Sequence, residues 1–268
     1  MNPPPSILVS STINSVGILQ KAADLAKKLG LPFVERVTED LSDFVLAYTP
    51  EGLALLHASA GGKKTLHRLL FVDFVGGKNA YRLHKDCSIK QPLARAAGIK
   101  SGLRPEVLDG TAGLGADAFV LASLGCQVTM CERSPVIAAL LADGLQRARE
   151  NKGTIANITQ RMRLMEGDAA NYLHHCAENY STVYLDPMYP HREDSALNRQ
   201  SMRIIRALAG DDQDSGELLT LAVAHATNRV VVKRPRLAPP LTEDAPSHII
   251  SMKNSRFDIY LTFNSCRS

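Results

Sequence analysis

The chain lacks tryptophan, and its few cysteines follow no pattern of a metal site or a disulfide framework. Five of the 268 residues are cysteine, and no two of them form a C-x-x-C pair. An odd number of scattered cysteines argues against a disulfide-rich secreted fold. We expect reduced, mostly packed thiols at Cys87, Cys126, Cys131, Cys176 and Cys266. The adjacent His174 and His175 have no further His or Cys at ligand spacing, so we expect no metal site.

Long apolar runs are also missing. No segment approaches the roughly 18 consecutive apolar residues that span a bilayer, and the N-terminus lacks the basic flank and apolar segment of a signal peptide. We therefore expect a cytoplasmic protein without membrane association. The composition is that of an ordinary soluble protein, with 45% hydrophobic and 22% charged residues, which suffices for one large domain with a smaller lobe.

The charge is unevenly distributed along the chain. Residues 1–100 contain 13 Lys and Arg against 8 Asp and Glu, whereas residues 101–268 contain 18 against 19. A basic excess of this size suits a lobe that faces a polyanion such as nucleic acid, and it equally suits a solvated surface. Apolar spacing predicts a helix over residues 16–29 and strands over 33–37, 44–48 and 53–57, which together make a small α+β lobe.

Residues 107–133, VLDGTAGLGADAFVLASLGCQVTMCER, are the most informative stretch. A short apolar run ends at Asp109, a glycine-rich loop containing Gly113 follows, a helix is expected over 116–124, and a second apolar run ends at Glu132. This is half of a nucleotide-binding βαβ unit, in which glycines let the backbone approach a ligand and the closing acid can accept hydrogen bonds from ribose hydroxyls. The glycine spacing alone also fits a nicotinamide site or a turn without any ligand.

The rest of the chain predicts a doubly wound α/β sheet. Further strands over residues 163–166, 182–185 and 229–233 alternate with helical segments, among them residues 136–150 after the start signal Ser134-Pro135 and residues 196–208. Residues 248–263 resemble a terminal hairpin. We expect a mostly parallel sheet with a C-terminal antiparallel hairpin. The expected domains are an N-terminal α+β lobe over residues 1–100 and a larger α/β domain over residues 101–268.

Acids close four of the predicted strands, at Asp109, Glu132, Asp168 and Asp186. Because ligands of open α/β sheets lie beyond the carboxyl ends of the strands, these side chains are expected to converge on one crevice. A pyrophosphate would be a poor ligand there. A ligand rich in amines and hydroxyls with a positive centre fits better, and S-adenosylmethionine has these features.

The segment Asp186-Pro187-Met188-Tyr189 indicates the methyl acceptor. The exocyclic amine of a nucleobase is a poor nucleophile because its lone pair is delocalised into the ring. Asp186 and the carbonyl of Pro187 can accept hydrogen bonds from such an amine, and Tyr189 can stack on the base, which contributes about 1–3 kcal/mol. The same segment could also have no functional role and simply be a proline-rich turn at the end of a strand, with its tyrosine packed in the core.

These motifs, with the segments AALLADGLQRA, SALNRQSMRIIRAL, RVVVKRPRLAPPL and RFDIY, resemble the ribosomal RNA small-subunit methyltransferase J family over about residues 105–260. The resemblance implies a Rossmann-like class I methyltransferase sheet and S-adenosylmethionine-dependent methylation of the exocyclic N2 amine of a guanosine in bacterial 16S rRNA. S-adenosylhomocysteine would be the product. The implied partner is 16S rRNA or the small ribosomal subunit, with no stable protein partner.

The resemblance also implies cofactor positions, which add to Asp109 and Gly113. They fall on Ala116, Asp117, Glu132, Arg133, Asp168, Ala169 and Asp186. The chain departs from the family pattern at Ala116, where an arginine is expected, and at Gly110, where an alanine is expected.

Basic residues later in the chain are candidates for contacts with RNA phosphates, among them Lys233, Arg234 and Arg236. Two other functions stay open. One is an amine methyltransferase that acts on DNA adenine or on a protein amide. The other is a non-catalytic RNA-binding or ribosome assembly factor that retains the fold.

Overall fold

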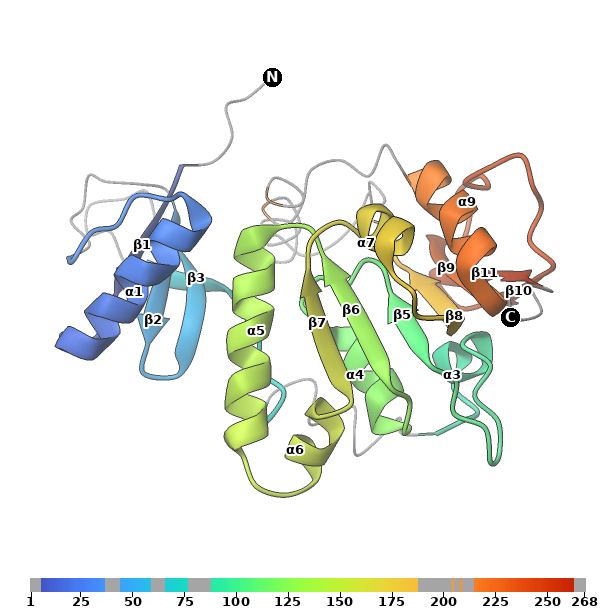
Figure 1. Cartoon of the computed structure of the whole chain (residues 1–268), viewed down its shortest axis with the longest axis horizontal. Coiled ribbons are helices and arrows are strands. Elements are labelled where there is room, and N and C mark those ends of the chain that lie inside the picture. Colours follow the sequence, from blue (N-terminus) through green and yellow to red (C-terminus); the bar gives the residue numbers. More distant parts are fainter. Residues whose placement is uncertain are drawn as a thin grey trace.

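The computed structural model describes residues 6–36, 44–58, 66–76, 88–187, 204, 208 and 215–262. Within these ranges the strands form a four-stranded sheet of order β1-β2-β3-β4 and a seven-stranded sheet of order β10-β11-β9-β8-β5-β6-β7. Figure 1 shows the smaller sheet on one side of helix α5 and the larger sheet on the other. No helix of the described part is long and apolar enough to cross a membrane.

The smaller sheet belongs to the N-terminal lobe, which is α+β as the sequence predicts. Its elements are β1 (Ile7–Ser11), α1 (Val16–Leu29), β2 (Phe44–Thr49), β3 (Gly52–Ala58) and β4 (Leu66–Phe71). β1 and β2 are parallel, and the other pairs are antiparallel. Helix α1 buries Ala22 and Ala26, and it ends at Gly30, whose left-handed φ of 64° lets its N–H bond back to the last turn.

Two details of the lobe differ from the sequence prediction. The strand expected over residues 33–37 is wrong: Phe33 makes one isolated bridge to Val9, because only Pro32 O and Val34 N bond with the backbone of Val9. Strand β4 was not predicted. Its first three residues are exposed, so it shows no alternation of apolar and polar residues.

The larger sheet has the predicted architecture, with a mostly parallel core and a C-terminal antiparallel hairpin. The parallel strands are β5 (Val107–Asp109), β6 (Val128–Glu132), β7 (Met162–Glu166), β8 (Tyr180–Leu185) and β9 (Ala226–Pro235). The hairpin consists of β10 (His248–Ser251) and β11 (Ser255–Leu261), and β11 runs antiparallel to β9. The direction of winding reverses between β5 and β8, which is where open α/β sheets bind their ligands.

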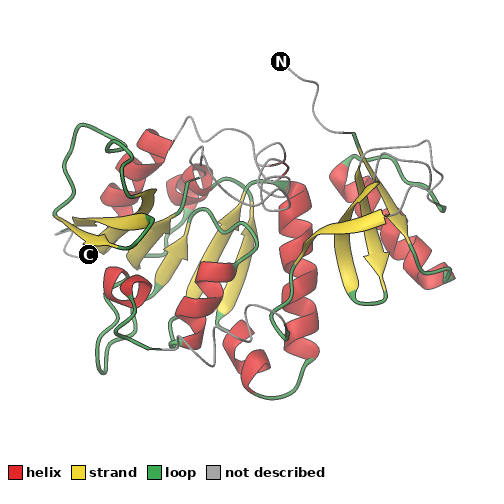
Figure 2. Ribbon diagram, turned by 180° about the vertical axis from the view of Figure 1, so that it is seen from behind, coloured by secondary structure: helices red, strands yellow, loops and turns green. Residues whose placement is uncertain are grey.

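Helices cover both faces of this sheet. They are α3 (Pro92–Ala96), α4 (Ala116–Ser123), α5 (Pro135–Glu150), α6 (Thr154–Thr159), α7 (Ala169–His175) and α9 (Ser215–His225). Figure 1 shows α7 and α9 in front of the strands, and Figure 2 shows α4 in front of them from behind. The neighbouring β5 residues Val107 and Leu108 belong to two different apolar clusters, one on each face, as the pleat requires. The helix expected over 196–208 lies outside the described residues, except for Ile204 and Leu208.

Helix α5 joins the lobe to the larger sheet. The Oδ2 atom of Asp143 accepts hydrogen bonds from Leu53 N at 3.0 Å and from Arg147 Nε at 2.7 Å. The Arg147 guanidinium lies 4.5 Å from the ring centroid of Phe71 and also donates to Val72 O. These contacts hold the lobe against the middle and the second half of α5, which begins just after the acid that ends β6.

Candidate functional site

The carboxyl ends of four neighbouring strands, β8, β5, β6 and β7, form one edge of the larger sheet, which we call the carboxyl edge. Asp109 ends β5 and Glu132 ends β6, while Asp186 directly follows β8 and Asp168 lies two residues beyond β7. In Figure 1 this edge lies at the top, where α5 begins. The strand order therefore brings the four acids singled out by the sequence to the same edge.

Glu132 is held against the glycine-rich loop. Its Oε2 atom accepts a hydrogen bond from Gly113 N at 2.8 Å, and its Oε1 atom accepts one from Ser134 N at 2.8 Å. The loop reaches this position through a left-handed backbone at Gly113, with a φ of 54°, which only glycine adopts without strain. The side chain is buried, and each carboxylate oxygen can accept more than one hydrogen bond, so Glu132 is oriented to receive further donors.

Asp109 is the most deeply buried acid of the edge, with 2% of its surface exposed. Burial raises the pKa of its carboxyl group to about 8, and a hydrogen bond from Thr111 N opposes this rise. The negative charges of Asp117, Asp186 and Glu132 raise the pKa further. These four acids are thus close enough to repel one another, and we call them the acid cluster.

Lys233 of β9 lies inside the acid cluster. Its Nζ atom is 2.7 Å from Asp186 Oδ2 and 2.9 Å from Asp117 Oδ2. The hydroxyl of Tyr184 donates to the same Asp117 oxygen at 2.7 Å, and the backbone N–H of Asp186 donates to Thr111 Oγ1 at 2.6 Å. Burial lowers the pKa of Lys233, but the two carboxylates raise it more, so the ammonium stays charged.

The sequence did not predict the place of Lys233. It grouped this residue with Arg234 and Arg236 as candidates for phosphate contacts. In the structure Lys233 pairs with two carboxylates, and Arg234 is 2% exposed with a guanidinium that donates to Pro239 O, so among the three only Arg236 is exposed. The sequence did place Lys233 at the end of the predicted strand over residues 229–233. The pattern of residues alone does not tell to which side of the sheet its side chain points.

The remaining predicted site residues lie along the same edge. Asp168 caps α7, and its Oδ1 atom accepts a hydrogen bond from Asn171 N at 3.0 Å. Buried Ala169 begins α7, half-buried Ala116 begins α4, Arg133 is half-buried, and Pro187 is buried directly after Asp186. Tyr189 lies outside the described residues. Among the described residues, no group of three or more His, Cys, Asp or Glu side chains is arranged to hold a metal ion.

Gly110, where the resemblance led us to expect alanine, lies in close packing just beyond β5. A Cβ atom added there would be 2.8 Å from Leu185 Cδ2 and 3.3 Å from Ala169 Cβ. The glycine therefore lets the end of β8 and the start of α7 pack closely against the loop.

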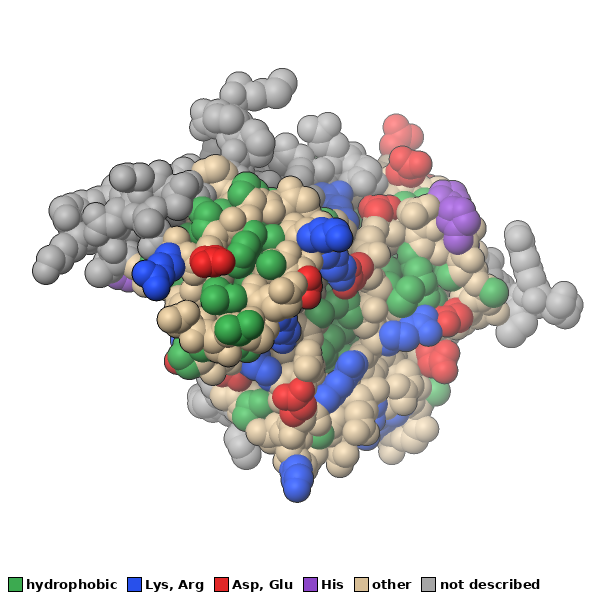
Figure 3. All heavy atoms as spheres, turned by 60° about the vertical axis from the view of Figure 1, so that its left-hand side comes forward, with side chains coloured by type: hydrophobic (Ala, Val, Ile, Leu, Met, Phe, Trp, Pro, Cys, Tyr) green, Lys and Arg blue, Asp and Glu red, His purple; other side chains and the backbone are tan. Residues whose placement is uncertain are grey.

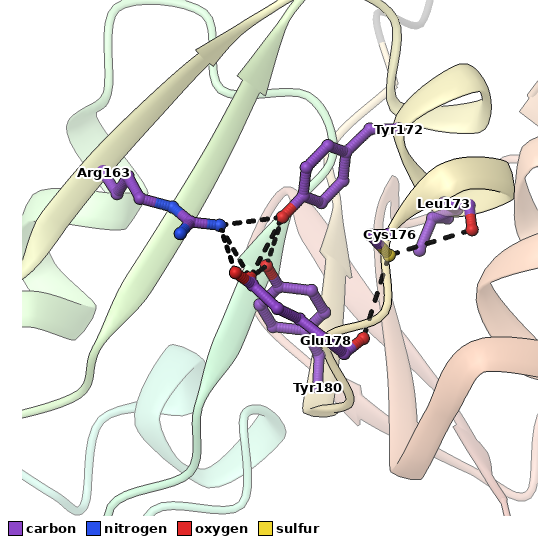
Figure 4. Close-up of polar contacts among 6 residues, drawn as sticks. All are labelled: Arg163, Tyr172, Leu173, Cys176, Glu178 and Tyr180. Atoms are coloured by element: carbon purple, nitrogen blue, oxygen red, sulfur yellow. Dashed lines mark hydrogen bonds and ion pairs between the residues drawn. The ribbon is translucent and has the colours of Figure 1, made fainter.

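A second polar cluster lies toward the amino ends of the strands, opposite the carboxyl edge. The Arg163 guanidinium contacts Glu178 Oε2 at 2.6 Å and the Tyr172 hydroxyl at 2.9 Å, and Tyr180 also donates to Glu178 (Figure 4). This cluster ties the segment between α7 and β8 to β7. It borders a cavity of about 540 Å³ lined by Glu106, Gln127, Val128, Thr129, Gln160, Arg161, Arg163, Glu178, Asn179 and Tyr180.

Known proteins resemble this chain over most of its length. A family model described as "Putative SAM-dependent methyltransferase" matches residues 24–262. A relative from Desulfotalea psychrophila, named ribosomal RNA small subunit methyltransferase J, is 50% identical over 91% of this chain and 92% of its own length. A relative of the same name from Thioalkalivibrio sulfidiphilus is 46% identical over 95% of this chain and 98% of its own. The chain belongs to the ribosomal RNA small subunit methyltransferase J family.

A solved structure extends the likeness of this methyltransferase J family member to the whole fold. The crystal structure of an S-adenosylmethionine-dependent methyltransferase from Neisseria gonorrhoeae is 31% identical, with a TM-score of 0.71 over 97% of this chain and 98% of its own. Because the coverage includes the first hundred residues, the N-terminal lobe is shared along with the larger sheet.

S-adenosylmethionine, the methyl donor of the methyltransferase J family, fits the charge of the carboxyl edge. The ligand carries a positive sulfonium and an amino group. The Asp117 and Asp186 carboxylates share the Lys233 ammonium, so the three groups together carry one net negative charge, which suits a cation. The two oxygens of Glu132, held by backbone donors beside the glycine loop, suit ribose hydroxyls.

Proposed function

We propose that the chain transfers the methyl group of S-adenosylmethionine to the exocyclic N2 amine of a specific guanosine in bacterial 16S rRNA, in the cytoplasm. The observation that carries the proposal is Asp186-Pro187 at the end of β8, next to the acid cluster that suits the cofactor. The names of the relatives, which specify small-subunit ribosomal RNA, support the substrate. The choice of the guanine amine rests on the resemblance and on the hydrogen-bond acceptors of this motif.

In the proposed reaction the acceptor amine is held by Asp186 and by the carbonyl of Pro187, and Tyr189 stacks on the base. When bound, the cofactor would supply an electrophilic methyl group to the lone pair of the amine that Asp186 and Pro187 hold, with S-adenosylhomocysteine as the leaving group, and the amine proton would pass to water. Orientation of the amine is the main contribution of the protein. A paired guanine would first have to be extruded from its helix.

On the cofactor side, Glu132 is proposed to hold the ribose hydroxyls and Asp168 the adenine amine. Asp117 and Asp186 offer negative charge to the sulfonium and amino groups, and Asp109, which retains its proton at neutral pH, can take part in hydrogen bonds beside them. Gly113, Ala116, Arg133 and Ala169, which lie along the same edge, are proposed to contact the cofactor as well.

Methylation of undermodified small ribosomal subunits tests the proposal. The chain and S-adenosylmethionine are incubated with the subunits, and the rRNA nucleosides are measured by mass spectrometry. We expect N2-methylguanosine, and we expect Asp186→Ala to abolish it without a loss of Tm. Glu150→Ala, which alters an exposed acid at the far end of α5, serves as the matched control and keeps full activity.

Two results would contradict the proposal. Methylated DNA adenine or a methylated protein amide, without N2-methylguanosine, would assign a different acceptor amine. No calorimetric signal for S-adenosylmethionine would instead favour a non-catalytic RNA-binding or assembly factor.

A further inference from the structure

We propose that Lys233 is a positioning residue, which holds the Asp186 carboxylate in place for the acceptor amine and ties it to Asp117 on the cofactor side. The proposal rests on the methyl transfer proposed above. A single Nζ atom contacts Oδ2 of both acids, at 2.7 Å for Asp186 and 2.9 Å for Asp117. The bridge thus joins the end of β8 to the first turn of α4.

Contacts from the two strands that flank β8 hold Asp186 in place. From the β5 side, Thr111 Oγ1 accepts the backbone N–H of Asp186 at 2.6 Å. From the β9 side, the Lys233 ammonium donates to the side chain. Because β5 and β9 flank β8 in the sheet, these two contacts restrain the backbone and the carboxylate independently. Reacting groups must be held closely for orientation to accelerate a reaction, and this double restraint supplies that condition.

The bridge also offsets repulsion within the acid cluster. Asp117 and Asp186 approach the same ammonium, so without Lys233 two carboxylates would face each other in a partly buried site. Like charges at this range repel, and the Asp186 side chain, of which 39% is exposed, can turn toward solvent. Asp117 cannot follow, because the Tyr184 hydroxyl, on a ring that is 1% exposed, holds it.

Two measurements therefore move in opposite directions when the ammonium is removed. The rate of methyl transfer falls because Asp186 is no longer held. The affinity for S-adenosylmethionine does not fall and is expected to rise, because Lys233 has the same sign of charge as the sulfonium and its loss removes one positive charge from beside two carboxylates. A general structural defect would weaken both properties together.

Lys233→Met, which keeps the length of the side chain without its charge, tests the proposal. We expect kcat on undermodified small subunits to fall by about 10- to 100-fold, which corresponds to roughly 1.4–2.7 kcal/mol at the transition state. We expect the calorimetric Kd for S-adenosylmethionine to be equal or lower, and Lys233→Arg to restore much of kcat. Lys152→Met, an exposed lysine between α5 and α6, is the matched control and keeps wild-type values.

The outcomes separate this proposal from its alternatives. A kcat within twofold of wild type, or a weakened Kd that accompanies a lowered Tm, would overturn it. A raised KM for subunits with an unchanged kcat would also overturn it and would make Lys233 an RNA contact. If Lys233→Met does not fold, Lys233→Gln carries the same test. Absence of N2-methylguanosine with the wild-type chain contradicts the proposed function itself and is thus distinct from a failure of the Lys233 variant alone.

Discussion

Asp109 shows how a single buried residue makes stability depend on pH. Its native pKa is about 8, whereas the ordinary value is 3.8. Between these values the native state retains a proton that the unfolded state has lost. The stability that the protonated group contributes is thus complete below about pH 4 and disappears as the pH rises through 8.

Asp109→Asn should remove this dependence, because the amide oxygen can still accept from Thr111 N and the side chain no longer titrates. We expect the free energy of unfolding of the variant, relative to wild type, to rise between pH 5 and pH 8.5, with a slope of at most about 1.4 kcal/mol per pH unit. Urea unfolding at three pH values measures it. Asp24→Asn on α1, an exposed acid, is the control, and parallel curves for Asp109→Asn and wild type would contradict the prediction.

At the scale of single residues, the sequence identified the acids of the site by their position at the ends of predicted strands. It could not identify the side chains that contact them. Asp109, Glu132 and Asp186 follow short apolar runs, and parallel strands necessarily bring such ends to one edge. Lys233 and Tyr184 lie within runs of apolar residues, and neither spacing nor composition tells which way they point. Their contact with Asp117 depends on β9 lying beside β8, a fact of sheet order that no local pattern encodes.

At the scale of elements, helix α5 packs closely against the lobe. A Cβ atom added to Gly144 would lie 2.4 Å from Val72 Cγ1, 2.7 Å from Val72 Cβ and 3.1 Å from Val72 O. Val72 is branched at Cβ and cannot move away through its side chain alone. Any side chain at position 144 therefore pushes the backbone after β4 away from α5.

Gly144→Ala should consequently destabilise the protein by about 1–3 kcal/mol, despite the higher helix propensity of alanine. Urea unfolding followed by circular dichroism measures this loss. The control is Gly17→Ala in α1, where an added Cβ meets no atom within 4 Å and propensity alone should give a neutral or stabilising effect. Equal stability of the two variants would show that the lobe adjusts to α5 without cost.

The elements that the sequence predicted are those with strong local signals. The α1 helix has a regular apolar spacing and a glycine at its end, and α5 begins with Ser134 as cap followed by Pro135. The helix α6 was not assigned, and α7 was expected only as a helical segment without bounds between two strands, since helices of six and seven residues show too few turns for a period to emerge. The α9 helix was missed because it is apolar on most sides, which removes the contrast on which periodicity depends.

At the scale of the whole molecule, direct contacts join the N-terminal lobe to the carboxyl edge of the larger sheet. Besides the α5 contacts, the Lys28 ammonium of α1 lies 2.7 Å from the carboxylate of Glu166 at the end of β7. Figure 3, which brings the lobe forward, shows Lys and Arg side chains interspersed with Asp and Glu on this face. The described cations on this face therefore do not form one uninterrupted patch, and each is expected to contribute separately.

Salt dependence distinguishes an RNA-facing lobe from a merely solvated one. Each phosphate contact adds about 0.7–0.9 to the slope of log affinity against log salt. Lys21 and Lys27 are exposed on α1. If the lobe lies against rRNA, Lys21→Gln combined with Lys27→Gln should flatten this slope for subunit binding by up to about 1.8, while kcat at saturating subunits stays unchanged.

Fluorescence titration of labelled subunits at several salt concentrations measures the slope. The matched control combines Lys152→Gln with Lys253→Gln, which removes the same charge from exposed positions outside the lobe, so that a mere change in net charge affects both double variants alike. A flatter slope in the α1 variant alone would establish phosphate contacts by the lobe. Long-range attraction by net charge does not depend on which lysines are removed. Identical slopes in the two double variants would therefore mean that the basic residues of the lobe form a solvated surface.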